Sequence, residues 1–393
     1  MAFQFIKELK EMKIGIVIDE LISGGFQKVA IMEAKYMQKM GLDVTLVVLH
    51  RIKNEGYRDL IKENGIKVVH LSDRLPLYLR LNFRFPFFSF FSFFHIAYPF
   101  FIYKYIKKSE FDIFITHATY TALSSIAIKN KLGIPYICFV HDSVTYILKQ
   151  KYQNRFLGKF LNFLLPVAKK LDKKIIINAK SIIAFPYMLK ELRKVEPSYQ
   201  NYYPIYNGCE PIDKKDIQYK KENFAIAVTK WDKGKNFGFL LKIWEKMEQK
   251  IPLKVVGSFS PESLKDFYQK QIDKRGLSEY IEIVGRVSEE ELKSYYIKAK
   301  FLIHPCREAF GMTILEAAAC GCPAIFSINS GVAELFCENV RLILPKEKDL
   351  DQYLRAAISF LNNKKDFADI FYRAAIANSW EKHSRAICNN FEL

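Results

Sequence analysis

The sequence predicts an α/β protein built from two successive doubly wound parallel sheets. Short β-branched runs alternate with longer stretches of helical periodicity, beginning with Lys13–Ile18 and a helix over Phe26–Met40 that ends at Gly41. The pattern restarts at Phe224 after a junction near Tyr203–Lys220. A chain of 393 residues also exceeds what one core usually covers. Two domains are therefore expected.

The runs that predict buried strands form two sets. The first set is Lys13–Ile18, Val44–Leu49, Ile66–His70, Asp112–Thr116, Pro135–Val140 and Ser181–Phe185. The second set is Phe224–Val228, Leu253–Val256, Ile281–Val284, Phe301–His304, Ala324–Ser327 and Arg341–Leu344, separated by helices such as Ser288–Lys298. Ligands bind such folds at the carboxyl ends of the strands, so a cleft between the two units is the expected site.

The charge is unevenly distributed along the chain. The formal net charge is +18, and residues 1–200 hold 31 Lys and Arg against 16 Asp and Glu, whereas residues 201–393 hold 29 against 26. A basic half indicates an anionic partner such as a phosphorylated substrate or an acidic membrane, although a solvated lysine-rich surface gives the same count. No nucleic-acid motif accompanies it, so no nucleic-acid partner is expected. Seven scattered cysteines and a charged first segment without a secretory pattern indicate a cytoplasmic protein.

One run carries most of the chemical information. The strand that ends at His304 leads into a loop with Glu308 and Gly311, and a helix over Met312–Cys320 follows. The free N–H groups at such a helix start suit a phosphate. Glu308 and Glu316 are spaced to meet sugar and ribose hydroxyls, which carboxylates bind well.

This run resembles the Glu-x7-Glu signature of family 4 of the retaining glycosyltransferases, which have the GT-B fold. Six other segments also resemble that family: Gly24-Gly25, Val140-His141-Asp142, Asn207-Gly208, the basic loop from Thr229 through Lys230 to Lys235, Gly285-Arg286-Val287-Ser288 and Gly331-Val-Ala-Glu334. Near the end of the chain, Ser379-Trp380-Glu381 resembles the start of the family's closing helix, which crosses back to the first domain.

The resemblance implies a domain plan and a reaction. It implies two Rossmann-like domains that face a central cleft: 1–205 on the acceptor side, 206–375 for the nucleotide sugar, and 376–393 as the crossover helix. The donor is a nucleoside-diphosphate sugar, and the anomeric configuration is retained. The reaction takes place at the front face of the sugar, where the leaving phosphate helps to deprotonate the acceptor.

The resemblance also implies roles for single residues. The catalytic candidates are Glu308, His141, Lys235 and Lys230. The donor-binding candidates are Gly24, Gly25, Asn207, Arg286, Val287, Phe310, Gly311, Met312, Thr313 and Glu316. On the acceptor side we expect His117 and Tyr120, although His117 is equally well explained as a structural histidine.

No metal and no other cofactor are expected, because fixed lysines and backbone dipoles replace the divalent cation that other transferases use. Asp349-Leu-Asp351 has the form of a metal-binding Asp-x-Asp motif. It precedes a helical pattern, however, so helix capping is the predicted role of Asp349.

Two segments of the first domain suggest a membrane surface. Phe83–Tyr103 holds twelve Phe or Tyr, and Pro86 and Pro99 bracket a predicted helix of about thirteen residues, with Ser89, Ser92 and His95 as a polar stripe. Such a helix is too short to span a bilayer but long enough to insert partly. Lys151–Lys174 carries seven Lys or Arg and one Asp. The alternative is that both segments are helices packed in the core of the first domain or at a dimer contact.

The predicted function is therefore transfer of a sugar from a UDP- or GDP-sugar to a saccharide or lipid-linked acceptor, by a peripheral protein at the cytoplasmic membrane face. A transferase acting on a soluble acceptor is one alternative, and a non-catalytic or regulatory sugar-nucleotide-binding protein is another. An epimerase or phosphorylase fits less well, since a phosphorylase is a much longer chain with a lysine for pyridoxal phosphate.

Overall fold

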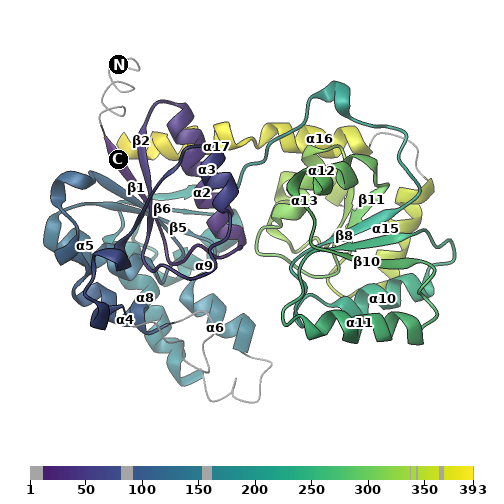
Figure 1. The fold of residues 1–393 in the computed structure, drawn as a ribbon, viewed down its shortest axis with the longest axis horizontal. Helices are drawn as coiled ribbons and strands as arrows, with labels where there is room; N and C mark the ends of the chain where they lie inside the picture. The colour runs from purple at the N-terminus through teal and green to yellow at the C-terminus, as the bar shows by residue number, and fades with distance from the viewer. Residues whose placement is uncertain are drawn as a thin grey trace. The chain divides into compact units, whose positions relative to one another are not determined.

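The computed structural model describes residues 12–80, 92–152, 162–336, 338–341, 344–362 and 367–392. The chain divides into two compact units, Met1–Tyr206 together with Trp380–Leu393, and Asn207–Ser379. Each unit has its own parallel sheet (Figure 1). The predicted class, two doubly wound α/β units, is therefore confirmed.

The first unit contains a seven-stranded sheet in the order β3-β2-β1-β4-β5-β6-β7. Its strands are β1 (Lys13–Ile18), β2 (Asp43–Val48), β3 (Lys67–His70), β4 (Ile113–His117), β5 (Tyr136–Val140), β6 (Ser181–Ala184) and β7 (Tyr202–Pro204). The strand order reverses between β1 and β4, which makes this pair the switch point of the sheet. The sequence did not predict β7, because this three-residue strand ends in a proline at the domain junction.

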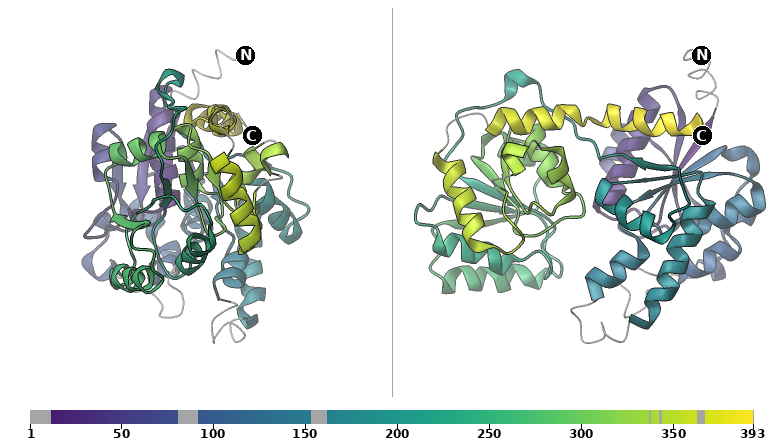
Figure 2. Two further views of the ribbon diagram at one scale, coloured as in Figure 1. Left: turned by 90° about the vertical axis from the view of Figure 1, so that its right-hand side faces the viewer. Right: turned by 180° about the vertical axis from the view of Figure 1, so that it is seen from behind.

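Helices cover both faces of this sheet, as right-handed crossovers on either side of a switch point require. On one face, α2 (Gly25–Lys39) packs against the C-terminal helix α17 (Trp380–Cys388), so the predicted return of that helix to the first domain is confirmed (Figures 1 and 2). On the other, α5 (Ala122–Leu132), α8 (Leu165–Asn178) and α9 (Pro186–Val195) bury the main core. The smaller helices are α3 (Arg58–Glu63), α4 (Phe93–Ala97) and α6 (Val144–Tyr152).

The second unit contains a five-stranded sheet in the order β10-β9-β8-β11-β12, with its switch point between β8 and β11. The strands are β8 (Ala225–Val228), β9 (Leu253–Val256), β10 (Ile281–Gly285), β11 (Phe301–Ile303) and β12 (Ala324–Ile325). The helices are α10 (Phe237–Lys246), α11 (Ser263–Lys274), α12 (Glu289–Lys298), α13 (Met312–Ala319), α14 (Glu338–Arg341), α15 (Leu350–Asn362) and α16 (Phe367–Ala377). Figure 1 shows α12, α13 and α16 on one side of the strands and α10 and α11 on the other.

Two sequence expectations in the second unit have clear outcomes. The predicted strand at Arg341–Leu344 is wrong at its described ends, because Arg341 closes α14 and Leu344 lies outside any strand. A short apolar run of this kind does not distinguish a strand from a helix end. The predicted capping role of Asp349 is confirmed, since its Oδ1 accepts a hydrogen bond from the Gln352 N–H at 3.0 Å.

The aromatic segment is only partly described, because residues 81–91 lie outside the described ranges. A continuous helix from Pro86 through Ser92 is wrong, since Ser92 has an extended backbone and caps the short helix α4. Ser92 and His95 do not form an exposed polar stripe. Both are buried, and the Ser92 N–H donates to Nδ1 of His95 at 3.0 Å.

The described part of this segment supports internal packing. Phe94, Tyr98 and Ile102 are fully buried in the core of the first unit, and Ile106 follows them there. Of the second basic segment, residues 153–161 lie outside the described ranges, and the rest forms part of α6 and of α8 with the turn before it. Among the described residues, no helix is both long and apolar enough to cross a bilayer.

Candidate active site

The switch point of the second unit brings two predicted catalytic residues into contact. Lys235 lies in the loop after β8, and Glu308 lies in the loop after the neighbouring strand β11. The Lys235 Nζ donates to Oε1 of Glu308, and each side chain is 23% exposed. Because adjacent parallel strands end at the same edge, residues distant in the sequence meet here.

The charges of this pair stabilise each other. Burial alone would lower the pKa of Lys235, but the Glu308 carboxylate raises it above its usual value. Burial alone would raise the pKa of Glu308, but Lys235 and His304 lower it below the usual value. The site therefore holds a fixed cation next to a fixed anion, both still reachable from solvent. Such a pair can meet a substrate that carries both phosphates and hydroxyls.

His304, Cys306 and Glu308 are close enough to offer three ligands to a metal ion. The Nε2 atom of His304 lies 3.3 Å from Oε1 of Glu308, the oxygen that also binds the Lys235 ammonium. Burial raises the pKa of the Cys306 thiol to about 12, so this sulfur is a protonated and weak ligand. A neighbouring ammonium and a neutral thiol fit a divalent cation poorly.

Helix α13 begins beside Glu308 and presents its first amides. Gly311 stands at the N-cap with a φ of 107°, and the N–H groups of Met312 and Thr313 have no acceptor within the helix. Phe310 is buried, and its carbonyl accepts from the Val332 N–H at 2.8 Å. Asn207 reaches the same helix through Nδ2, 3.3 Å from Sδ of Met312.

We expect Gly311→Ala to lower the free energy of unfolding by about 2 kcal/mol, because a side chain rarely adopts this φ and strain of this kind costs about 1–3 kcal/mol. The new Cβ would also lie 2.9 Å from Cδ1 of Ile314. Urea unfolding measures the effect. Gly238→Ala in α10, whose added Cβ meets nothing within 4 Å, is the control and should not destabilise the protein. Equal stability of the two variants would contradict the strain at Gly311.

The remaining donor-side candidates of the second unit lie along the same sheet edge or on α13. Lys230 is exposed just after β8, and Arg286 is exposed just after β10, where Gly285 has a φ of 86°. Val287 follows Arg286 and is half-buried, and Glu316 is half-buried on α13, one turn beyond Met312. Within the described ranges, no hydrogen bond or ion pair joins Lys230 or Arg286 to Glu308.

In the first unit, the carboxyl ends of the adjacent strands β4 and β5 bring two predicted residues into contact. His117 ends β4, and His141 directly follows β5. Nδ1 of His117 lies 3.1 Å from Nε2 of His141, and the His141 ring stacks on Phe139 with a centroid distance of 4.5 Å. Gly24 and Gly25 lie at the start of α2, where an added Cβ at Gly25 would meet nothing within 4 Å. The backbone is therefore open at Gly25, whereas an added Cβ at Gly24 would overlap Oε1 of Gln27.

Two buried residues that the sequence did not indicate extend this histidine pair. Glu33 of α2 accepts from Nε2 of His117 at 2.7 Å through one oxygen, and from Nε2 of His383 at 2.8 Å through the other. Although burial alone would raise the pKa of Glu33, the two histidines lower it to about 2. A carboxylate therefore links the C-terminal helix to the end of β4.

The hydrogen-bond partners of these histidines determine which ring nitrogens carry a hydrogen. Nδ1 of His383 faces the Tyr206 carbonyl oxygen at 2.6 Å and must donate, and Nε2 donates to the Glu33 carboxylate, so His383 is an imidazolium. The negative charge of Glu33 is already balanced by the positive charge of His383, so a second buried cation at this place would have no partner and would be costly. His117 is therefore neutral, with hydrogen on Nε2 only.

The proton of His141 follows from that of His117. An unprotonated Nδ1 in His117 accepts from Nε2–H of His141. Burial keeps the pKa of His141 well below its usual value, so the ring is neutral. The Nδ1 atom of His141 then carries no hydrogen. It can accept a hydrogen bond from a substrate hydroxyl.

Tyr120 joins another buried acid at this edge. Its hydroxyl donates to Oδ2 of Asp19 at 3.3 Å, while Gln27 and the Glu20 N–H donate to Oδ1 at 3.3 Å and 2.7 Å. Asp19 directly follows β1, the other strand of the switch point. Burial raises the pKa of Asp19 to about 6, against the opposing effect of these hydrogen bonds.

The raised pKa of Asp19 predicts a pH-dependent stability. The folded state retains the proton more tightly than the unfolded chain, so this contribution is complete below about pH 4 and is lost as the pH rises through about 6. The loss should approach about 3 kcal/mol by pH 7. In Asp19→Asn this dependence should be absent, whereas Asp59→Asn, at an exposed position, should keep it. Denaturant unfolding at pH 4, 5, 6 and 7 measures it, and identical pH profiles for wild type and Asp19→Asn would contradict it.

Two Rossmann-like units, each built on a parallel sheet, define a protein of the GT-B class. Comparison with known protein families supports this class over most of the chain. The family model described as Glycosyltransferase Family 4 matches residues 23–211, and the model described as Glycosyl transferases group 1 matches residues 210–377. The chain belongs to this group 1 / family 4 of glycosyltransferases.

Similar proteins come from several organisms. An uncharacterised glycosyltransferase of Methanocaldococcus jannaschii is 26% identical over 70% of this chain and 74% of its own length. A Campylobacter jejuni protein is 25% identical over 72% of this chain and 80% of its own, and is named N-acetylgalactosamine-N,N'-diacetylbacillosaminyl-diphospho-undecaprenol 4-alpha-N-acetylgalactosaminyltransferase.

Solved structures share the fold across the chain. Anabaena HepE, solved with UDP and glucose, has a TM-score of 0.72 at 15% identity and covers 97% of this chain and 100% of that one. The sucrose-phosphate synthase of Thermosynechococcus elongatus has a TM-score of 0.74 at 15% identity, covering 97% and 98%. At such identities, these matches establish the fold.

Proposed function

We propose that the protein is a retaining, metal-independent hexosyltransferase. It moves a sugar from a UDP- or GDP-sugar to a lipid-linked saccharide or glycolipid at the cytoplasmic face of the membrane, where it binds peripherally. The observation that carries the proposal is the Lys235–Glu308 pair at the start of α13. It combines a cation for a diphosphate, a carboxylate for sugar hydroxyls and free amides for phosphate oxygens.

In the proposed reaction, departure of the nucleoside diphosphate is the difficult step, because negative charge develops on its phosphate. Lys235, Lys230 and the amides of residues 310–312 and of Gly25 stabilise that charge. Cations and amides fixed in advance do this without a metal ion. The departing phosphate then takes the acceptor's proton at the same face of the sugar.

The other residues bind the substrate in this proposal. Glu308 orients the sugar through its hydroxyls, and Glu316 holds the ribose. Arg286 and Val287 border the base. Asn207, Thr313 and Gly24 complete the donor contacts, and His141 accepts a hydrogen bond from a sugar hydroxyl through Nδ1. His117 and Tyr120 stand on the acceptor side, where they support His141 and Asp19.

A lipid-linked acceptor is supported by the basic first unit and by the name of the Campylobacter jejuni relative, which includes a diphospho-undecaprenol acceptor. The core packing of Phe94 and Tyr98 weakens the case for insertion of the aromatic segment. Membrane attachment in this proposal therefore relies on charge more than on that segment.

The test of this proposal is transfer from radiolabelled UDP-, GDP- and ADP-sugars in detergent, with and without a total lipid extract. Label that moves from one donor into the organic phase only when lipid is present is the expected result. Label in a water-soluble product instead would favour a soluble acceptor. Binding of a donor without its consumption would favour the non-catalytic alternative. Inversion at the anomeric carbon of the product would contradict retention.

A further inference from the structure

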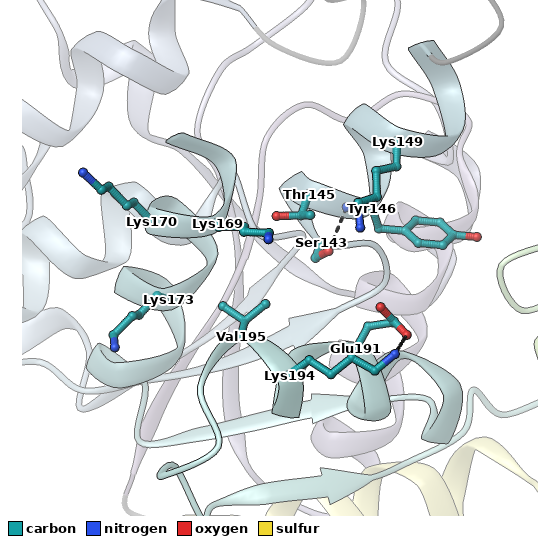
Figure 3. A pocket seen from close by; sticks show the side chains of 10 residues that line it. All are labelled: Ser143, Thr145, Tyr146, Lys149, Lys169, Lys170, Lys173, Glu191, Lys194 and Val195. Atoms are coloured by element: carbon teal, nitrogen blue, oxygen red, sulfur yellow. Dashed lines mark hydrogen bonds and ion pairs between the residues drawn. The ribbon is translucent and has the colours of Figure 1, made fainter. Parts of the chain in front are cut away.

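A basic cavity in the first unit is lined by none of the residues assigned above. It has a volume of about 330 Å³ and is lined by five lysines, Lys149, Lys169, Lys170, Lys173 and Lys194, with one acid, Glu191. Figure 3 shows Lys149 on one helix, Lys169, Lys170 and Lys173 on a second, and Lys194 on a third. These helices are α6, α8 and α9. A cavity of this size falls in the usual range for small-ligand sites.

Only part of this positive charge is balanced. Lys194 pairs with Glu191 at 2.6 Å, and Lys173 pairs with Glu196 at 2.7 Å. Lys149, Lys169 and Lys170 form no ion pair with any residue in the described ranges. Figure 3 shows the Lys170 side chain pointing away from Ser143 and Lys149, which leaves Lys149 and Lys169 as the unbalanced charges that face the cavity. These two like charges repel each other, and an anion bound between them removes that repulsion.

The free N–H groups at the start of α6 already have an acceptor in the protein interior. Asp172 of α8 is buried and accepts the Val144 and Thr145 N–H groups, both at 2.9 Å. An anion in the cavity is therefore bound by side chains and not by the end of this helix. Ser143 contributes a hydroxyl, since its Oγ accepts from the Tyr146 N–H at 3.0 Å and keeps its own hydrogen to donate. Asp172 also ties α6 to α8, which holds the lysines of the two helices in place.

We propose that this cavity binds the diphosphate group that links the acceptor saccharide to its lipid. This inference rests on the proposed transferase function and specifies its acceptor. A diphosphate diester carries two charges and several acceptor oxygens, which match the two ammonium groups of Lys149 and Lys169 and a hydroxyl better than a single carboxylate does. Ser143 is two residues beyond His141, so a saccharide attached to the bound diphosphate starts close to the end of β5.

Two exposed apolar side chains favour a lipid as the source of the diphosphate. Val167 is 52% exposed on α8, three residues before Lys170 and therefore on an adjoining face. Phe163, just before the helix, is 59% exposed. An isoprenoid chain that leaves the cavity can cover both. A soluble sugar phosphate leaves them in water.

The experiment measures binding of farnesyl diphosphate to the full chain by calorimetry, with UDP binding measured on the same samples. Two variants remove the unpaired lysines, Lys169→Ala/Lys170→Ala on α8 and Lys149→Ala on α6. Lys174→Ala/Lys190→Ala, exposed on α8 and α9 but outside the cavity, is the matched control. We expect the dissociation constant of farnesyl diphosphate to rise roughly 10- to 100-fold in the double variant of the cavity and several-fold in Lys149→Ala. The control should bind as the wild type does, and UDP binding should not change in any variant.

The outcomes separate the possible ligands. Equal weakening in the cavity and control variants would overturn the site, because it would reflect overall charge. Inorganic diphosphate that binds as tightly as farnesyl diphosphate, with the same lysine dependence, would overturn the lipid source. Binding to phosphatidylglycerol vesicles alone would replace the diphosphate by a membrane surface. Failure of UDP and GDP to bind the wild type would instead count against the proposed transferase function, and the farnesyl diphosphate result would still decide the cavity.

Discussion

Lys235→Ala and Glu308→Ala should each lower kcat by about 10²- to 10³-fold, the usual effect of removing one group that stabilises developing charge. In the first variant the leaving diphosphate loses its contact with the lysine. In the second variant the donor sugar loses the carboxylate that orients it. Because the two side chains contact each other, the double variant should lose little more than either single one. Nucleoside diphosphate release under saturating donor measures kcat.

Lys233→Ala is the matched control for this loss. Lys233 is exposed in the same loop, two residues before Lys235, and should keep wild-type turnover. Thermal unfolding of each variant shows whether the fold is preserved. Folded Lys235→Ala and Glu308→Ala proteins that both work at near wild-type rates would remove the pair from the mechanism.

Glu33→Gln should lower the free energy of unfolding by about 3 kcal/mol or more, because the change leaves the buried His383 imidazolium without its carboxylate. It should also lower kcat, since His117 and His141 lose the partner that defines their ring protons. The stabilising contribution of Glu33 is present above about pH 4.5 and is lost as the pH falls through about 2. Loss of stability over that acid range should therefore be smaller in Glu33→Gln than in the wild type.

A double-mutant cycle with His383→Gln tests the origin of this effect. In Glu33→Gln/His383→Gln no buried charge remains unpaired at these two positions, so stability should recover part of the loss. Long-range ¹H–¹⁵N spectra of the histidines report the ring protons directly. Additive destabilisation in the cycle, or a proton on Nδ1 of His141 in the wild type, would contradict the proposed arrangement.

Most of the fold could be predicted because its strands are short apolar runs between clear breakers. β1 and β9 match the predicted bounds, β5 and β8 differ by one residue at one end, and β2 is shifted by one residue at both ends. The exceptions have local causes. β7 ends in a proline, the run at Arg341 is too short to tell strand from helix end, and Ser92 caps a helix where a continuous one was expected.

Only those residues of the candidate site that lie at or after the end of a strand could be predicted from the sequence. Glu308, Lys235, His117 and His141 all follow or end predicted strands, and the strand order explains why they meet in pairs. Glu33 and His383 lie on helices 350 positions apart in the sequence. No local pattern joins them, since each is one polar residue on a largely buried helix face. Asp19 was missed for a related reason, because burial and not residue type makes it titrate near neutral pH.

The most direct test of the central claim is release of nucleoside diphosphate from UDP-, GDP- and ADP-sugars by the wild-type protein in excess EDTA, with lipid extract present. The proposed function predicts that one donor is consumed, that EDTA does not slow the reaction, and that Lys235→Ala slows it by about 10²- to 10³-fold. If EDTA stops the reaction, the metal-independent mechanism is wrong. If no donor is consumed or bound, the assignment of a donor site to Lys235, Glu308 and α13 is wrong.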